Sequence, residues 1–149
     1  MKKIIKVYNI IKNRLPKTYF IPKIKIYKTV YSMLKAEAKE RGKTYKQIKS
    51  RYNTYLKQTK ESKYNYIKTK YDTSPSLKRK TREKCLSIQA LSSSPIKINL
   101  QNTIGFNLQA LIFLLLHEIG HHYYKNPTEQ LVDKFAIRWI KRLLKEKII

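Results

Sequence analysis

The chain has 149 residues, 42% of them hydrophobic, which is enough to bury one modest core and predicts a single domain over residues 1–149. With 34 Lys and Arg residues against 9 Asp and Glu, the formal net charge is +25, which indicates a nucleic acid or other acidic partner, or simply a heavily charged surface. Cys85 is the only cysteine, which excludes an intrachain disulfide, and the longest apolar run, residues 110–116, is too short for a membrane span; we expect a cytoplasmic protein.

The basic first part of the chain, residues 1–84, is expected to be mainly helical. Residues 4–15 carry apolar side chains at helical spacing and are followed by Pro16. They predict an amphipathic helix that either docks on the protein or contacts a membrane surface or a partner. Residues 19–27 alternate after Pro22 and predict a strand near the edge of a sheet.

A second helix is predicted over residues 29–41, with Gly42 as the residue that ends it. Residues 43–72 are then rich in lysine and tyrosine. Aromatic rings among cations can stack nucleic-acid bases and neutralise phosphates. The same spacing also suits an ordinary helix whose tyrosines cover the core edge while its lysines face water, and we favour that interpretation.

Two alternating segments follow, residues 85–91 and 96–101, separated by the turn sequence Ser92-Ser93-Ser94-Pro95. This pattern predicts a β-hairpin. Asn107 is then suited to cap the N-terminus of the next helix, because its side-chain oxygen can accept a hydrogen bond from a backbone N–H of the first turn.

The residues with the clearest chemistry lie on the next stretch, Leu108 to Tyr124, whose nearly continuous apolar character predicts a buried helix. His117 and His121 are four residues apart, so they share one helix face and can bind one metal ion. Glu118 lies one position further round, where its carboxylate can accept a proton from a water at the ion and later donate it. His122, rotated by about 100° from His121, is expected to be a packing residue.

A catalytic zinc ion needs a third protein ligand, and the following helix offers two acids on one face, Glu129 and Asp133. We assign Glu129 as the third ligand and Asp133 as the carboxylate that accepts from the outer N–H of a ligand imidazole. An alternative role for Glu129 is local, because residues 126–129 also match a helix start with a capping acid. Tyr124, close to His121, is a candidate substrate contact.

The sequence His117-Glu118-Ile119-Gly120-His121, followed by Glu129, Asp133 and Phe135-Ala136, resembles the gluzincin zinc metallopeptidases. Within that group the short gap before Glu129 and the continuation Asp133-Lys134-Phe135-Ala136 look most like the ImmA/IrrE-type peptidases, which act on DNA-binding repressors. The compact length is also similar to that of minimal gluzincins with little beyond the catalytic core. The resemblance covers about the last third of the chain. It implies a zincin-like fold, a Zn²⁺ cofactor and a protein or peptide substrate such as a repressor. It also implies an edge strand that pairs with an extended substrate, at Ile96, Lys97, Ile98 and Asn99.

We therefore expect an α+β fold in which a small, largely antiparallel sheet covers the histidine helix, with the glutamate helix behind it. Residues 85–149 are the expected zinc-binding catalytic core. The expected function is a zinc-dependent endopeptidase, active or held latent by the rest of the chain. The alternative is a basic nucleic-acid-binding or regulatory protein with a structural zinc or an inactive site, for which the segment 43–72 is the motivating feature.

Overall fold

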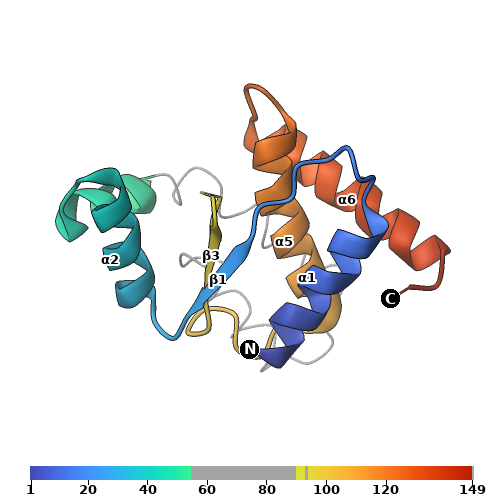
Figure 1. The fold of residues 1–149 in the computed structure, drawn as a ribbon, viewed down its shortest axis with the longest axis horizontal. Coiled ribbons are helices and arrows are strands. Elements are labelled where there is room, and N and C mark those ends of the chain that lie inside the picture. Colours follow the sequence, from blue (N-terminus) through green and yellow to red (C-terminus); the bar gives the residue numbers. More distant parts are fainter. Residues whose placement is uncertain (55–89, 93, 149) are drawn as a thin grey trace. The chain divides into compact units, whose positions relative to one another are not determined.

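The computed structural model describes residues 1–54, 90–92 and 94–148. Its elements, shown in Figure 1, are α1 (Lys2–Arg14), β1 (Ile24–Tyr27), α2 (Val30–Arg41), β2 (Ala90–Leu91), β3 (Ile96–Asn99), α5 (Leu108–Tyr123) and α6 (Glu129–Lys145). Residues 45–54 are also helical. Helices with one small sheet confirm the α+β class. The remaining parts of the predicted strand 85–91 and of the segment 43–72 lie outside the described residues.

The described strands form one sheet in the order β1-β3-β2. The backbone N–H of Ile96 donates to the carbonyl of Lys23, and that of Leu100 donates to the carbonyl of Tyr27. These pairings advance together along both strands, so β1 and β3 are parallel. β2 and β3 are joined by residues 92–95 alone, which requires the predicted antiparallel hairpin. The sheet is therefore mixed rather than largely antiparallel.

β3 is the central strand, so the expectation that it is an edge strand is wrong. All four of its residues are buried, as in a strand covered on both faces. The Lys97 ammonium contacts two glutamates, and the Asn99 side chain accepts from the backbone N–H of Asn102. The Lys97 and Asn99 side chains thus make interior contacts, and substrate binding at Ile96, Lys97, Ile98 and Asn99 stays a prediction. β1 lies at the edge of the described sheet, as Pro22 predicts.

Short-range signals determine where the helices begin and end. The Thr29 hydroxyl accepts from the backbone N–H of Ser32 and caps α2, while Gly42 ends that helix in the left-handed region at φ 62°. The Asn107 side chain accepts from the backbone N–H of Ala110 at 2.8 Å and caps α5. Each of these hydrogen bonds joins residues at most four positions apart in the chain, so the local sequence determines where the helices begin and end.

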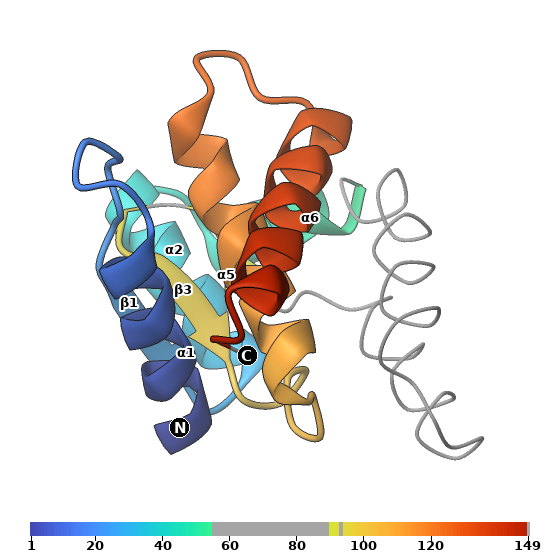
Figure 2. The same ribbon diagram turned by 90° about the vertical axis from the view of Figure 1, so that its right-hand side faces the viewer.

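The chain divides into two compact units. Unit 1 comprises Met1–Lys25, Ala90–Ile96 and Phe106–Ile149; unit 2 comprises Ile26–Gln89 and Lys97–Gly105. In unit 1, helix α5 contacts α1, α6 and β2, and Figure 2 shows α1 and α6 on either side of it. One face of α1 is buried, which favours the docked interpretation of that helix: Ile4, Val7, Ile11 and Leu15. Within the described residues, none of the helices combines the length and apolarity needed to span a bilayer.

A buried ionic network lies inside unit 2. Lys97, fully buried, places its Nζ 2.7 Å from Glu37 Oε2 and 2.6 Å from Glu40 Oε2. The second oxygen of Glu37 accepts from Arg41 Nε at 2.5 Å. Burial alone would raise the pKa of Glu37, but the hydrogen bonds from Lys97 and Arg41 outweigh burial and lower it. The network therefore keeps the Lys97 ammonium and the Glu37 carboxylate charged in the interior.

Candidate metal centre

Helix α5 carries two of the three predicted metal ligands, His117 and His121, and buries His117 in the interior of unit 1. Ala110 to Gly120 are all buried, because the helix contacts other elements on several sides. His117 is 1% exposed and Glu118 is 4% exposed. Placing an imidazole and a carboxyl group in such surroundings costs free energy unless both have polar partners. The burial therefore calls for partners at both side chains.

His117 has one partner on the next helix. Its Nδ1 lies 2.7 Å from Oδ1 of Asp133, which is also buried. If the carboxylate accepts, the proton is on Nδ1, and Nε2 on the other side of the ring is the nitrogen with a lone pair. A contact between Asp133 and a ligand imidazole was predicted, and the structure shows one at His117. Histidines that bind metals characteristically have such an outer carboxylate.

His121 lies one turn beyond His117 on the same helix. The two imidazole centroids are 5.1 Å apart and the ring planes meet at 72°. The spacing of four residues therefore brings the two rings together, as predicted. Glu118 is adjacent to His117 in the chain and buried beside it. Two imidazoles and one buried carboxyl group on consecutive turns supply the chemistry that a hydrolytic metal site uses.

Glu129 is the first residue of α6, and its side chain lies outside the described part of the structure. The cap of α6 is Thr128, whose hydroxyl accepts from the backbone N–H of Leu131. Glu129 is therefore at the first helical position, two residues before the place that a capping-box acid occupies. The alternative assignment, with Asn126 as the cap, is wrong. Among the side chains that the structure does describe, no group of three His, Cys, Asp or Glu forms a metal cluster.

Gly120 allows α5 and α6 to approach closely beside this site. A Cβ at position 120 would lie 3.1 Å from Cδ1 of Phe135 and 3.2 Å from Cβ of Val132. The Cβ of Val132 is fixed to the backbone of α6, so it cannot move aside without the helix. The same close approach brings Asp133, next to Val132, within reach of His117.

We expect Gly120→Leu to lower the free energy of unfolding by about 3 kcal/mol, through overpacking between α5 and α6. Gly120→Ala gains about 1 kcal/mol in helix propensity, so its net loss should be only about 1 kcal/mol. Urea denaturation measures both, with Gln130→Ala on the exposed surface of α6 as the control. A Gly120→Leu protein as stable as the wild type would contradict this close approach.

Sequence reasoning missed an aromatic segment that lies against the end of α5. The ring centroids of Tyr19 and Tyr123 are 4.8 Å apart, and those of Phe20 and His122 are 5.8 Å apart. His122 is thus a packing residue, as predicted, although its buried Nε2 makes no hydrogen bond within the described residues. Tyr124, the candidate substrate contact, packs edge-on against Phe135 at 6.2 Å. The two residues of each pair are more than 100 positions apart in the chain, so local sequence patterns do not reveal these contacts.

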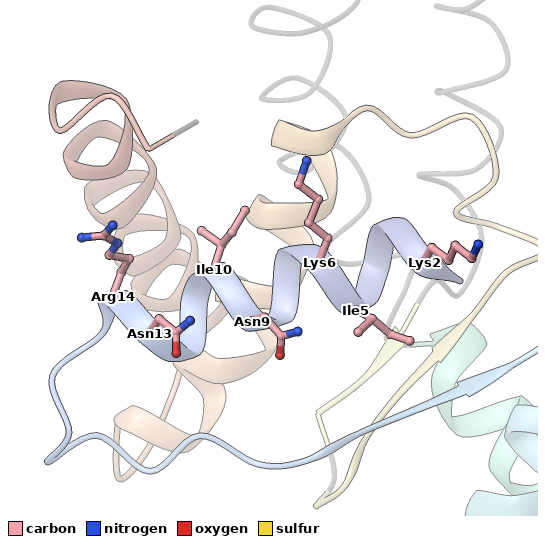
Figure 3. Close-up of a pocket in the computed structure, with 7 residues that line it drawn as sticks. All are labelled: Lys2, Ile5, Lys6, Asn9, Ile10, Asn13 and Arg14. Atoms are coloured by element: carbon pink, nitrogen blue, oxygen red, sulfur yellow. The ribbon is translucent and has the colours of Figure 1, made fainter.

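A separate hollow of about 550 Å³ lies along the outer side of α1, as Figure 3 shows. Every residue that lines it comes from this one helix, including the cations Lys2, Lys6 and Arg14. It contains no histidine or acid, so it is distinct from the candidate metal centre.

Comparisons of the chain with protein-family models, with curated proteins and with solved structures give no match. We therefore base the assignment of the candidate metal centre on the residues of α5 and α6 alone.

Proposed function

We propose that this chain is a zinc-dependent endopeptidase of the gluzincin type with a zincin-like fold. The observation that supports the proposal best is the 2.7 Å contact between Asp133 and Nδ1 of His117. The chain has only 9 acidic residues, and one of them is buried against the first histidine of the HExxH sequence. That arrangement holds an imidazole in the tautomer that a metal ligand requires.

The available donors suit zinc. His117 and His121 present imidazoles one turn apart, and the sequence assigns Glu129 on α6 as the third ligand. Two histidines and one glutamate form a donor set of catalytic zinc sites, in which a fourth position remains for water or substrate. When bound, zinc would act as a Lewis acid that polarises the scissile carbonyl and lowers the pKa of a water molecule toward about 7.

Glu118 performs the proton transfers in this mechanism. Its carboxylate takes a proton from the attacking water, and the resulting carboxylic acid donates that proton to the leaving amine. Asp133 holds the His117 ring in position throughout by accepting from Nδ1–H. The substrate class is a protein or peptide, and the resemblance to ImmA/IrrE-type peptidases makes DNA-binding repressors the first substrates to test.

The test compares wild type with Glu118→Gln. Both proteins should contain about one zinc per chain after reconstitution, because Glu118 is not a ligand. Cleavage by Glu118→Gln should fall by about 10²- to 10⁴-fold, because the amide cannot accept the proton. Metal analysis by mass spectrometry and cleavage of a quenched fluorescent peptide library measure the two quantities. Wild-type protein that holds no stoichiometric zinc after reconstitution would overturn the proposal.

A further inference from the structure

Two tyrosines of unit 2 form an aromatic pair at its surface. The Tyr31 ring on α2 and the Tyr45 ring on the helical segment 45–54 have centroids 4.9 Å apart and planes that meet at 61°. Tyr31 is 54% exposed. The contact joins two helices, yet it leaves more than half of Tyr31 in water. The pair therefore offers aromatic surface to a partner as well as packing.

Each tyrosine has a lysine four residues later on the same helix face. The Lys35 Nζ lies 5.7 Å from the centroid of Tyr31, and the Lys49 Nζ lies 5.9 Å from the centroid of Tyr45. Both lysines are exposed. We refer to Tyr31, Lys35, Tyr45 and Lys49 as the tyrosine–lysine surface.

In the part of unit 2 that the structure describes, the acids do little to balance the outer charge. In the described part of the unit the acids are Glu37 and Glu40, and both contact the buried ammonium of Lys97. The cations of α2 and its neighbouring segments are all exposed: Lys28, Lys35, Lys39, Arg41, Lys43, Lys46, Lys49 and Arg51. The surface around the tyrosine pair is thus strongly cationic and complementary to a polyanion.

We propose that the tyrosine–lysine surface binds single-stranded nucleic acid, with bases stacked on Tyr31 and Tyr45 and phosphates paired with Lys35 and Lys49. Rings among cations are the arrangement that binds single strands without sequence preference. A duplex keeps its bases stacked on one another, so it can use the lysines but not the rings. A helix that inserts into an anionic membrane presents a continuous apolar face rich in Trp, Phe or Leu, whereas this surface presents two tyrosines among lysines. The binding does not depend on the proposed zinc chemistry, because all four residues belong to unit 2.

The test is fluorescence anisotropy of the full chain with labelled oligothymidine and oligouridine of about 12 nucleotides. Tyr31→Ala and Tyr45→Ala should each weaken binding by about 5- to 100-fold, with an unchanged salt dependence because no charge is lost. Lys35→Gln and Lys49→Gln should each reduce the slope of log K against log salt by about 0.7. Stronger binding of oligouridine than of oligothymidine would identify RNA as the preferred ligand, and weaker binding would identify DNA. Equal binding would show that the surface accepts both.

Matched variants separate stacking from packing and from net charge. Tyr31→Leu keeps an apolar contact with Tyr45 but has no ring, so it should bind as weakly as Tyr31→Ala, while Tyr31→Phe should bind like the wild type. Lys6→Gln on α1 removes one charge from the other unit and should have little effect on affinity. Tyr31→Leu and Tyr45→Ala proteins that bind like the wild type would overturn the proposal, and so would binding to phosphatidylserine vesicles but not to oligonucleotides. Chelation of zinc should leave oligonucleotide binding unchanged, whether or not the peptidase proposal holds.

Discussion

Replacement of His117 by alanine is expected to weaken zinc binding by more than about 100-fold, whereas replacement of His122 should leave zinc bound. His117 combines the buried position on α5 with the Asp133 contact, and His122 packs on Phe20 instead. The two variants remove the same residue type from the same helix, so they form a matched pair. Asp133→Asn should weaken affinity less, by about 10- to 100-fold, because it affects only the outer partner of the imidazole. Competition with a chromophoric chelator measures all three affinities.

The order of these effects distinguishes a metal centre from a buried histidine that merely has a carboxylate partner. A structural His117–Asp133 pair would give variants with lower stability but an unchanged zinc content. Thermal unfolding with and without zinc separates the two cases, because a ligand that binds only the folded state raises its stability by RT ln(1 + [L]/Kd), where [L] is the free ligand concentration. Equal zinc content in His117→Ala and His122→Ala would rule out His117 as a ligand.

The second large effect is expected at Lys97. Lys97→Ala should lower the free energy of unfolding by about 3 kcal/mol or more, because it leaves Glu37 buried with only part of its partners. Lys39→Ala, an exposed lysine on α2, should stay within about 0.5 kcal/mol of the wild type. Denaturant titration measures both changes. Equal stability of the two variants would show that the network contributes little.

The same network has a defined pH dependence. Folding lowers the pKa of Glu37 from its ordinary value of 4.5, so its stabilisation is present above that value and is lost as the pH falls through the lowered pKa. For Lys97, burial opposes the charge, but the hydrogen bonds that its ammonium donates to Glu37 and Glu40 outweigh burial, and the pKa rises above 10.5. Its stabilisation is therefore present below 10.5 and is lost as the pH rises through the raised pKa.

The sequence predicted those features that depend on neighbours in the chain. The cap at Asn107 and the end at Gly42 were predicted and are correct, and α2 begins at Val30, one residue after the predicted start, with Thr29 as its cap. The His117–Asp133 contact was also predictable, because both residues sit on regular helices joined by a short connection. Helical periodicity determines which face of each helix a side chain occupies, and the short connection between α5 and α6 brings the two faces together.

Features that depend on the order of strands were not predictable in the same way. The resemblance to gluzincins implied an edge strand at residues 96–99, yet β3 is central and Lys97 is buried against glutamates about 60 positions earlier. From the sequence alone, a lysine in a strand is expected to face solvent, because the glutamates that would bury it are distant in the chain. The parallel pairing of β1 with β3 is equally non-local, and it makes the sheet mixed.

The docking of α1 on α5 determines which piece of this protein can be used on its own. The motif-bearing part, residues 85–149, includes α5 but not the helix that buries one of its apolar sides. A fragment that begins at residue 85 would expose to water the aliphatic side chains of α5 that α1 covers, and we expect it to self-associate. The first 25 residues complete the same unit although about 65 positions separate them from its next part. A minimal version of unit 1 would therefore have to be built by joining these two distant pieces or by supplying α1 as a separate peptide.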